Sequence, residues 1–394
     1  MTKDNQLQKQ IHIGIFELRA EAESVLTLSK MFKHCGYKVS LFLSLKIWER
    51  VKDFINRNDV NVLQVFEDDK KFIDIHEKIK VSIESNKIDL IIFPRFESTS
   101  YRETKSYIKF FNEHKVIVGM FNHDRWFSAF PKFKFNGFKL IKRSFILDWF
   151  YCHLVFKHIS AYFMSEIHRY SENPLKMIIH RKTDKKVFDL PFKLMDGNYN
   201  PNIEYEFPVF VIPGAIQKER RDYLKVLKCF LDPVMKRYKW KMILLGRPIG
   251  RYGKKILEMA DHINSLMGGD RIEYIREYIS KEEFDRFMNM STHILAPVNK
   301  AMFKYGKDSG ALYDVFKYNK IGIFEDFYFY SKDLIEKKVI LTFKSENDLK
   351  ELLSNIIMKK YSYDHVSEHF QEMSSYLEKN KYIDYAKNEM ASLL

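Results

Sequence analysis

Short apolar runs alternate with amphipathic stretches along most of this chain, and that alternation limits the folds it can adopt. In the first half the apolar runs predict strands at Ile11–Phe16, Lys38–Leu43, Val62–Phe66, Leu90–Pro94 and Val116–Phe121. The intervals between them have helical periodicity. Repeated strand–helix–strand order is typical of parallel sheets covered by helices. The expected fold class is therefore α/β.

The same order resumes after an irregular stretch, Ser171–Glu206, which contains Pro, Gly and several Asn residues and is the best linker candidate. A chain of 394 residues is also too long for one ordinary core. We therefore expect two Rossmann-like domains facing a cleft, at 1–200 and 206–375. The charged helical tail, 376–394, is expected to return and pack on the first domain. The strands predicted in the second half are Phe207–Ile212, Lys241–Leu245, Arg271–Tyr274, His293–Pro297 and Ile321–Phe324, with a helix expected at Arg220–Phe230.

The chain carries a net charge of +14, and the excess is concentrated in one aromatic segment, 131–186. That segment has twelve Lys or Arg residues against four Asp or Glu residues. Its aromatic residues, among them Phe156, Tyr162 and Phe163, interleave with Lys139, Lys142, Arg143 and other cations, as expected for contact with an anionic bilayer or a lipid-linked substrate. A core helix with solvated basic flanks is the alternative. No nucleic-acid-binding motif is present, and we expect no nucleic-acid partner.

Targeting and redox features favour a cytoplasmic protein that associates with the membrane surface. No run of about 18 uncharged apolar residues occurs, and the N-terminus lacks the apolar core of a signal peptide. The three cysteines, Cys35, Cys152 and Cys229, are widely separated and show neither disulfide-framework nor metal-ligand spacing. No Asp-x-Asp pair suggests a metal, so the prediction is metal-independent chemistry without a cofactor.

A small-residue turn followed by a helix, at Lys304–Asp314, has the composition of a phosphate site. Gly306, Ser309 and Gly310 allow close backbone approach, and a helix starting near Ser309 would direct N–H groups at an anion. Asp314, one turn inside, could accept hydrogen bonds from ribose hydroxyls. A turn that only caps a core helix is the simpler interpretation.

Several local signatures in the second half resemble the GT-B glycosyltransferases, in particular the retaining, family 4-like group that uses nucleotide-sugars. They are the strand, glycine and basic loop in Val211–Tyr223, the glycine turn after Leu244, the strand and loop from Arg271 to Phe284, and His293–Pro297 with the later Ser-Gly pair. The resemblance implies a donor site made by Gly214, Lys218, Arg220, Arg221, Gly246, Arg247, Arg276, Tyr278, Ser309, Gly310 and Asp314.

The chain departs from that group at one position. Many members carry two glutamates eight residues apart; Asp314 fits the second, but Gly306 stands at the first. Lys304, Lys307 or Asp308 could take a related role, and the sequence does not choose among them.

In the first domain, His123 and Asp124 follow the strand ending at Phe121, at the edge where α/β sheets bind ligands. They are the acceptor-side candidates, and His123 or Asp124 would be the general base of an inverting enzyme. A structural histidine and a stabilising Asp–Arg pair are the competing interpretations.

The sequence thus predicts a glycosyltransferase that moves a sugar from a UDP- or GDP-linked donor to a glycan or lipid-linked acceptor. Retention of configuration is favoured, with Arg220 assisting departure of the diphosphate. An inverting transferase is one alternative. A non-catalytic two-lobed ligand-binding or scaffold protein is the other.

Overall fold

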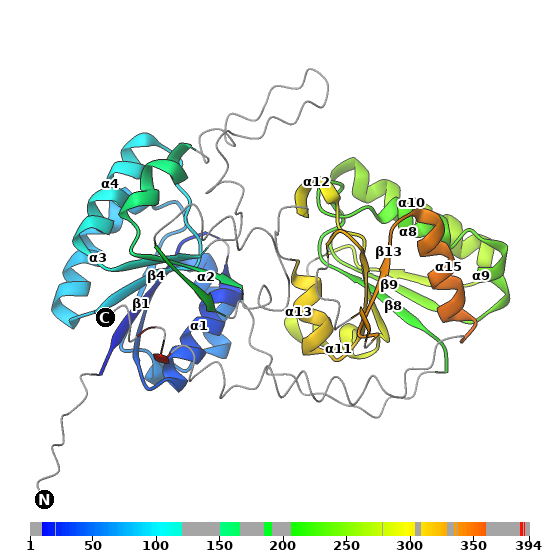
Figure 1. The fold of residues 1–394 in the computed structure, drawn as a ribbon, viewed down its shortest axis with the longest axis horizontal. Coiled ribbons are helices and arrows are strands. Elements are labelled where there is room, and N and C mark those ends of the chain that lie inside the picture. Colours follow the sequence, from blue (N-terminus) through cyan, green and yellow to red (C-terminus); the bar gives the residue numbers. More distant parts are fainter. Residues whose placement is uncertain are drawn as a thin grey trace, which may run out of the picture. The chain divides into compact units, whose positions relative to one another are not determined.

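The computed structural model describes residues 10–19, 21–119, 150–165, 185–190, 206–277, 279–303, 309–328, 335–336, 338–359, 387–388 and 390. The chain divides into two compact units (Figure 1). The first comprises Met1–Arg169, Asn173–Leu194 and Lys379–Leu394, and the second comprises Tyr170–Glu172 and Met195–Glu378. Within the described ranges, no helix is both long and apolar enough to cross a membrane.

The first unit is built on a seven-stranded sheet with strand order β3-β2-β1-β4-β5-β6-β7, all pairs being parallel. Its strands are β1 (His12–Glu17), β2 (Lys38–Ser44), β3 (Val62–Phe66), β4 (Leu90–Phe93), β5 (Val116–Gly119), β6 (Ala161–Ser165) and β7 (Lys186–Leu190). The central strands β1, β4 and β5 are buried at every position, as expected when helices cover both faces of a parallel sheet.

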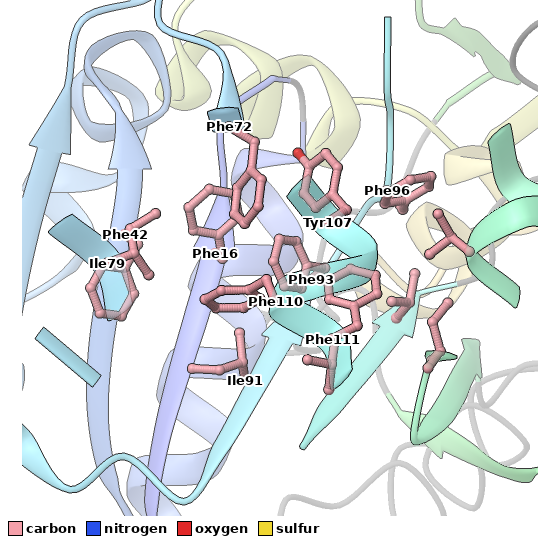
Figure 2. Close-up of a cluster of buried hydrophobic side chains, with 14 of the residues drawn as sticks. Phe16, Phe42, Phe72, Ile79, Ile91, Phe93, Phe96, Tyr107, Phe110 and Phe111 are labelled. Atoms are coloured by element: carbon pink, nitrogen blue, oxygen red, sulfur yellow. The ribbon is translucent and has the colours of Figure 1, made fainter. Parts of the chain in front are cut away.

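Helices α3 (Phe72–Asn86) and α4 (Tyr101–Glu113) cover one face of this sheet, and α1 (Ala22–His34) and α2 (Leu45–Val51) cover the other (Figure 1). Figure 2 shows the aromatic core beneath α3 and α4. Phe72 and Tyr107 stack with their ring centroids 3.9 Å apart, and the ring centroids of Phe16 and Phe93 are 4.7 Å apart. This cluster fixes both helices on the sheet, because each large ring buries substantial apolar surface.

Strands β6 and β7 correct part of the interpretation of the basic aromatic segment. Tyr162 and Phe163 are fully buried in β6, so they belong to the core and cannot lie on a bilayer. The Tyr162 hydroxyl donates to the Phe156 carbonyl oxygen at 2.8 Å. Strand β7 likewise places Lys186–Leu190 in the first sheet, although these residues fall within the predicted linker. The stretches 131–149 and 166–184 lie outside the described residues.

The second unit has a six-stranded parallel sheet with strand order β10-β9-β8-β11-β12-β13. The strands are β8 (Val209–Pro213), β9 (Lys241–Leu245), β10 (Ile272–Tyr274), β11 (His293–Ala296), β12 (Ile321–Glu325) and β13 (Ile340–Phe343). The helices are α8 (Tyr223–Cys229), α9 (Pro233–Arg237), α10 (Gly250–Met267), α11 (Lys281–Asn289), α12 (Lys300–Phe303), α13 (Gly310–Lys317) and α15 (Glu346–Ile357). Figure 1 shows α8, α9, α10 and α15 on one face of the sheet and α11 and α13 on the other. Both units confirm the α/β prediction and its Rossmann-like topology.

Each sheet contains one point at which the strand order reverses. In the first sheet this point lies between β1 and β4, and in the second between β8 and β11. The loops that leave neighbouring strands at such a point run in opposite directions and open a crevice at the carboxyl edge. The residues that follow β1, β4, β8 and β11 are therefore those positioned to bind a ligand.

His293 begins β11, at the amino edge of the second sheet, and its burial leads us to expect that the stability of this unit falls in acid. Burial, with a smaller effect of Lys320, lowers its pKa from 6.5 to about 3, so the folded unit holds it neutral. The unfolded chain takes up this proton below about pH 6.5, and stability should fall there by about 1.4 kcal/mol per pH unit until the folded pKa is reached. Denaturant titrations at pH 7.5, 5.5 and 4.5 measure this slope. A His293→Phe variant should flatten it, whereas the exposed His262→Phe should not; equal slopes in all three proteins would contradict the prediction.

Candidate functional site

The candidate site lies where β8 and β11 diverge. Helix α8 begins at Tyr223 rather than at Arg220, so the predicted helix start is wrong by three residues. The reason is Asp222, whose carboxylate accepts from the Lys225 amide at 3.2 Å and whose own amide donates to the Pro297 carbonyl at 2.8 Å. Lys218, Arg220 and Arg221 consequently occupy the loop before the helix, beside the residues that follow β11.

Arg221 is the distinctive residue of this loop. It is only 7% exposed, and a short antiparallel bridge to Val298 holds its backbone. Its guanidinium lies against Gly214, since a Cβ built there would come 2.7 Å from a terminal nitrogen. In the described part of the chain no carboxylate pairs with it, and its buried Nε has no hydrogen-bond partner. A buried cation without a counter-charge is costly, which indicates that an anion completes this environment.

Lys218 and Arg220 have exposed side chains, but their backbone is fixed. Asn299, which follows β11, donates its amide to the Arg220 carbonyl at 2.9 Å and its side-chain amide to the Lys218 carbonyl at 3.2 Å. The basic loop is thereby tied to the other side of the crevice. Burial distinguishes Arg221 from Arg220, which was the residue favoured on sequence; the role of Arg220 stays a prediction.

Gly214 and Gly246 bring two loops into backbone contact. Gly214 has φ +96°, a conformation that favours glycine, and its amide donates to the Leu245 carbonyl at 2.8 Å. A Cβ on Gly246 would lie 2.0 Å from the Gly214 carbonyl oxygen. The next residue, Arg247, is exposed, while its carbonyl accepts from the Ile216 amide at 3.0 Å. The sequence-predicted residues Gly214, Arg221 and Gly246 therefore come together.

Helix α13 starts where the sequence predicts, with Ser309 as its cap, but it offers one fewer amide than expected. The Ser309 hydroxyl accepts from Ala311 at 3.4 Å, and the Ser309 amide donates to the Tyr328 hydroxyl at 2.6 Å. The expectation that this amide is available to a phosphate is wrong in this structure. Gly310, the first helical residue, is exposed. Asp314 is 4% exposed within α13, and its contact with a ribose stays a prediction.

The remaining predicted residues are either elsewhere on this edge or outside the described chain. Arg276 follows β10 and donates to the Tyr274 hydroxyl at 2.9 Å, and that hydroxyl donates to Asp261 at 2.8 Å. This exposed network restrains the loop that the resemblance associates with a nucleobase. Tyr278, His123, Asp124 and Gly306 lie outside the described residues.

The crevice of the first unit has a different chemistry, because among its described residues carboxylates outnumber cations. Glu17 ends β1 and Glu103 lies in α4; they are 2% and 1% exposed. Arg95 pairs with Glu97 and, at 3.2 Å, with Glu21. The Arg19 guanidinium lies 3.7 Å from the Glu103 carboxylate and 3.9 Å from the Glu97 carboxylate. The backbone amide of Arg19 donates to the Glu17 carboxylate at 2.7 Å.

Sequence reasoning missed Glu97 and Glu103 in this crevice. Glu103 does carry a local signal: its amide donates to Ser100, the residue that caps α4. Its second role, accepting from both Thr99 donors at 2.7 and 2.8 Å, appears only in the fold. Burial alone would lower the pKa of Arg95, but Glu97, Glu21 and Glu17 raise it overall. Carboxylates held this way can accept hydrogen bonds from ligand hydroxyls or act as acids and bases.

Across the described residues, no group of three or more His, Cys, Asp or Glu side chains is arranged to hold a metal ion. The second crevice instead presents cationic and amide donors. Such donors suit a phosphate or diphosphate.

Comparison with known proteins gives matches in structure only. No family model and no curated protein sequence matches the chain. A trehalose-6-phosphate protein from E. coli, bound with UDP-2-fluoro glucose, is similar with a TM-score of 0.60 and 10% identity, covering 97% of this chain and 98% of that one. A UDP-GlcNAc 2-epimerase from Neisseria meningitidis, bound to UDP-GlcNAc, has a TM-score of 0.54 and 11% identity, covering 98% and 99%. A glycosyltransferase from Rickettsia africae has a TM-score of 0.52 and 9% identity, covering 94% and 99%.

The chain has the GT-B fold. These structures match it over nearly its whole length, and two parallel α/β units are what they share with it. The GT-B fold places the Arg221 crevice in the C-terminal Rossmann-like unit and the carboxylate crevice in the N-terminal one. At identities of 9–11% among the neighbours cited, the likeness describes architecture and does not assign an activity.

Proposed function

We propose that this GT-B protein is a glycosyltransferase that takes a sugar from a nucleoside-diphosphate-sugar and adds it to a glycan or lipid-linked acceptor. The observation that carries the proposal is the buried guanidinium of Arg221, which lies against Gly214 at the reversal point of the second sheet and pairs with no carboxylate among the described residues. A diphosphate supplies a counter-charge. Two neighbouring structures that contain UDP-sugars support a UDP-linked donor.

The chemistry follows from the leaving group. Breaking the bond between the sugar and the diphosphate develops negative charge on phosphate oxygens, and fixed donors stabilise that charge. Arg221 lies at the base of the loop, with Lys218 and Arg220 exposed beside it. We propose that these cations, with the Gly310 amide at the start of α13, neutralise the diphosphate without a metal, and that Asp314 contacts the ribose. Retention of configuration is proposed on the sequence resemblance.

A second candidate function is epimerisation of the sugar on its nucleotide. The carboxylate crevice of the first unit favours it, because Glu17, Glu97 and Glu103 would provide acid and base groups for moving a proton. One of the structural neighbours described above is a UDP-GlcNAc 2-epimerase. The two reactions differ in their need for an acceptor, so the fate of the donor separates them.

The first experiment is calorimetric titration with UDP, GDP, CMP and ADP, with Mg²⁺ and with EDTA. Saturable binding of one nucleoside diphosphate in EDTA supports a metal-independent donor site and names the base. Incubation of the matching nucleotide-sugar, followed by NMR, then shows an epimerised donor or an acceptor-dependent release of diphosphate. If the protein binds none of the four nucleotides, the proposal is overturned and the ligand-binding or scaffold alternative is favoured.

Membrane association is a separate part of the proposal and concerns residues outside the described chain. Lys139, Lys142 and Arg143 lie in the segment with the largest basic excess. Because each basic residue near an anionic surface contributes about 1 kcal/mol, replacing all three by Gln should reduce co-sedimentation with phosphatidylserine vesicles roughly a hundredfold. Replacing Lys228, Lys236 and Arg237 of the second unit is the charge-matched control. Equal loss in both triple variants would show a net-charge effect instead.

A further inference from the structure

The loop that carries Arg221 is fixed by two tyrosine hydroxyls from different helices. Tyr223, the first residue of α8, donates its hydroxyl to the Gly214 carbonyl at 2.8 Å. Tyr252, in the first turn of α10, accepts from the Tyr223 amide at 3.1 Å and donates to the Arg221 carbonyl at 3.4 Å. These contacts link Gly214, Arg221, Tyr223 and Tyr252 in a closed ring, because the Arg221 guanidinium lies against Gly214.

This ring of contacts depends on where α10 begins. A Cβ on Gly253 would lie 2.7 Å from Pro248, so the first turn of α10 packs directly on the loop that follows β9. Pro248 in turn forms a bridge with Ile216, and the Ile249 amide donates to the Ile216 carbonyl at 3.1 Å. Tyr252 therefore approaches the Arg221 loop from a backbone fixed at two points.

Both tyrosines are suited to act as permanent donors. Tyr223 is fully buried, and burial raises the pKa of its hydroxyl to about 12. Burial also raises the pKa of the Tyr252 hydroxyl. Both hydroxyls thus stay protonated at neutral pH. No carboxylate in the part of the chain that the structure describes orients the Arg221 guanidinium, so its neighbours must hold this buried cation in place.

We propose that Tyr252 is a positioning residue for the diphosphate: its hydroxyl joins α10 to the backbone of Arg221 and Tyr223 and so holds the guanidinium in the orientation that binds the anion. This inference rests on the proposed nucleotide-sugar function and names a determinant of diphosphate affinity. Tyr252 is not itself a ligand-contacting residue. It acts through Arg221.

The test is a double-mutant cycle with three probes: UDP, uridine and inorganic pyrophosphate. Tyr252→Phe should weaken UDP and pyrophosphate about tenfold, the effect of one lost positioning hydrogen bond, and leave uridine unchanged. In an Arg221→Gln background, Tyr252→Phe should have no further effect, because the group that it positions is gone. Tyr318→Phe is the matched control: it removes a tyrosine hydroxyl bonded to Asp285 at the amino edge of the sheet, and all three affinities should be retained.

Two results would overturn the inference. One is an equal loss of uridine and UDP affinity in Tyr252→Phe, which shows a general disturbance of the unit. The other is a tenfold loss that persists when Arg221 is already Gln, which shows that Tyr252 acts independently of the guanidinium. If the natural protein binds pyrophosphate but no nucleotide, the proposed function fails and the pyrophosphate cycle alone decides the inference. If it binds neither, both fail.

Discussion

Arg221→Gln is expected to weaken UDP binding about a hundredfold, equivalent to roughly 3 kcal/mol, because two or more charge-assisted hydrogen bonds to the diphosphate are lost. The same change should leave the ligand-free protein as stable as before, or more stable, since it removes a buried charge that has no protein counter-charge in the described chain. Calorimetry with UDP and a denaturant titration without it measure the two effects. Opposite signs for binding and stability are the signature of a residue held for a ligand.

Two other arginines of the second unit provide the controls for this result. Arg220→Gln changes an exposed side chain and should cost only a fewfold in affinity. Arg237→Gln, at the end of α9, should change neither quantity. If Arg221→Gln retains UDP affinity, the diphosphate is bound elsewhere. If it lowers the stability of the ligand-free protein by several kcal/mol, the guanidinium is a structural group.

Gly246→Ala is expected to produce the largest loss of stability in the second unit. Its new methyl group would lie 2.0 Å from the Gly214 carbonyl oxygen and 2.4 Å from the carbonyl carbon, so two loop backbones must separate. Overpacking of this kind costs about 1–3 kcal/mol or more, which lowers the melting temperature of a unit of this size by roughly 5–10 °C. UDP affinity should fall as well, because Gly214 also contacts Arg221.

Gly269→Ala is the control, since a Cβ there meets no atom within 4 Å and the backbone is not in the left-handed region. Its melting temperature should remain within about 2 °C of the natural protein, as expected for a surface change. Thermal unfolding followed by circular dichroism compares the two variants. Similar melting temperatures would mean that the loops separate easily and that Gly246 is not required for the site.

The strands were largely predictable, because a strand buried on both faces reads as a continuous apolar run. Lys241–Leu245, buried at four of its five positions, was placed without error, and so was the partly exposed edge strand Val62–Phe66. Strands β6 and β7 were missed because cations surround them: the buried Tyr162 and Phe163 looked, in sequence, like the aromatic part of a basic surface. Composition averages over a segment, whereas a strand of five residues needs only its own positions to be apolar.

The candidate site was predictable only at the level of its loops. The sequence indicated a basic loop after β8, but adjacent arginines cannot be told apart without the bridge from Arg221 to Val298 that turns one of them inward. The carboxylates of the first unit come from widely separated positions, from Glu17 to Glu103, and meet because parallel strands bring their carboxyl ends to one edge. Such convergence follows from topology, and local spacing carries no trace of it.

The first unit is discontinuous in sequence, since Met390, from the last five residues of the chain, is fully buried and belongs to it. During synthesis from the N-terminus, the whole of the second unit is made before Met390 is available. Domains generally fold as units while the chain emerges. The unit whose synthesis starts first is therefore the last to acquire its full core, so the Arg221 crevice can form on the ribosome before the other unit is complete.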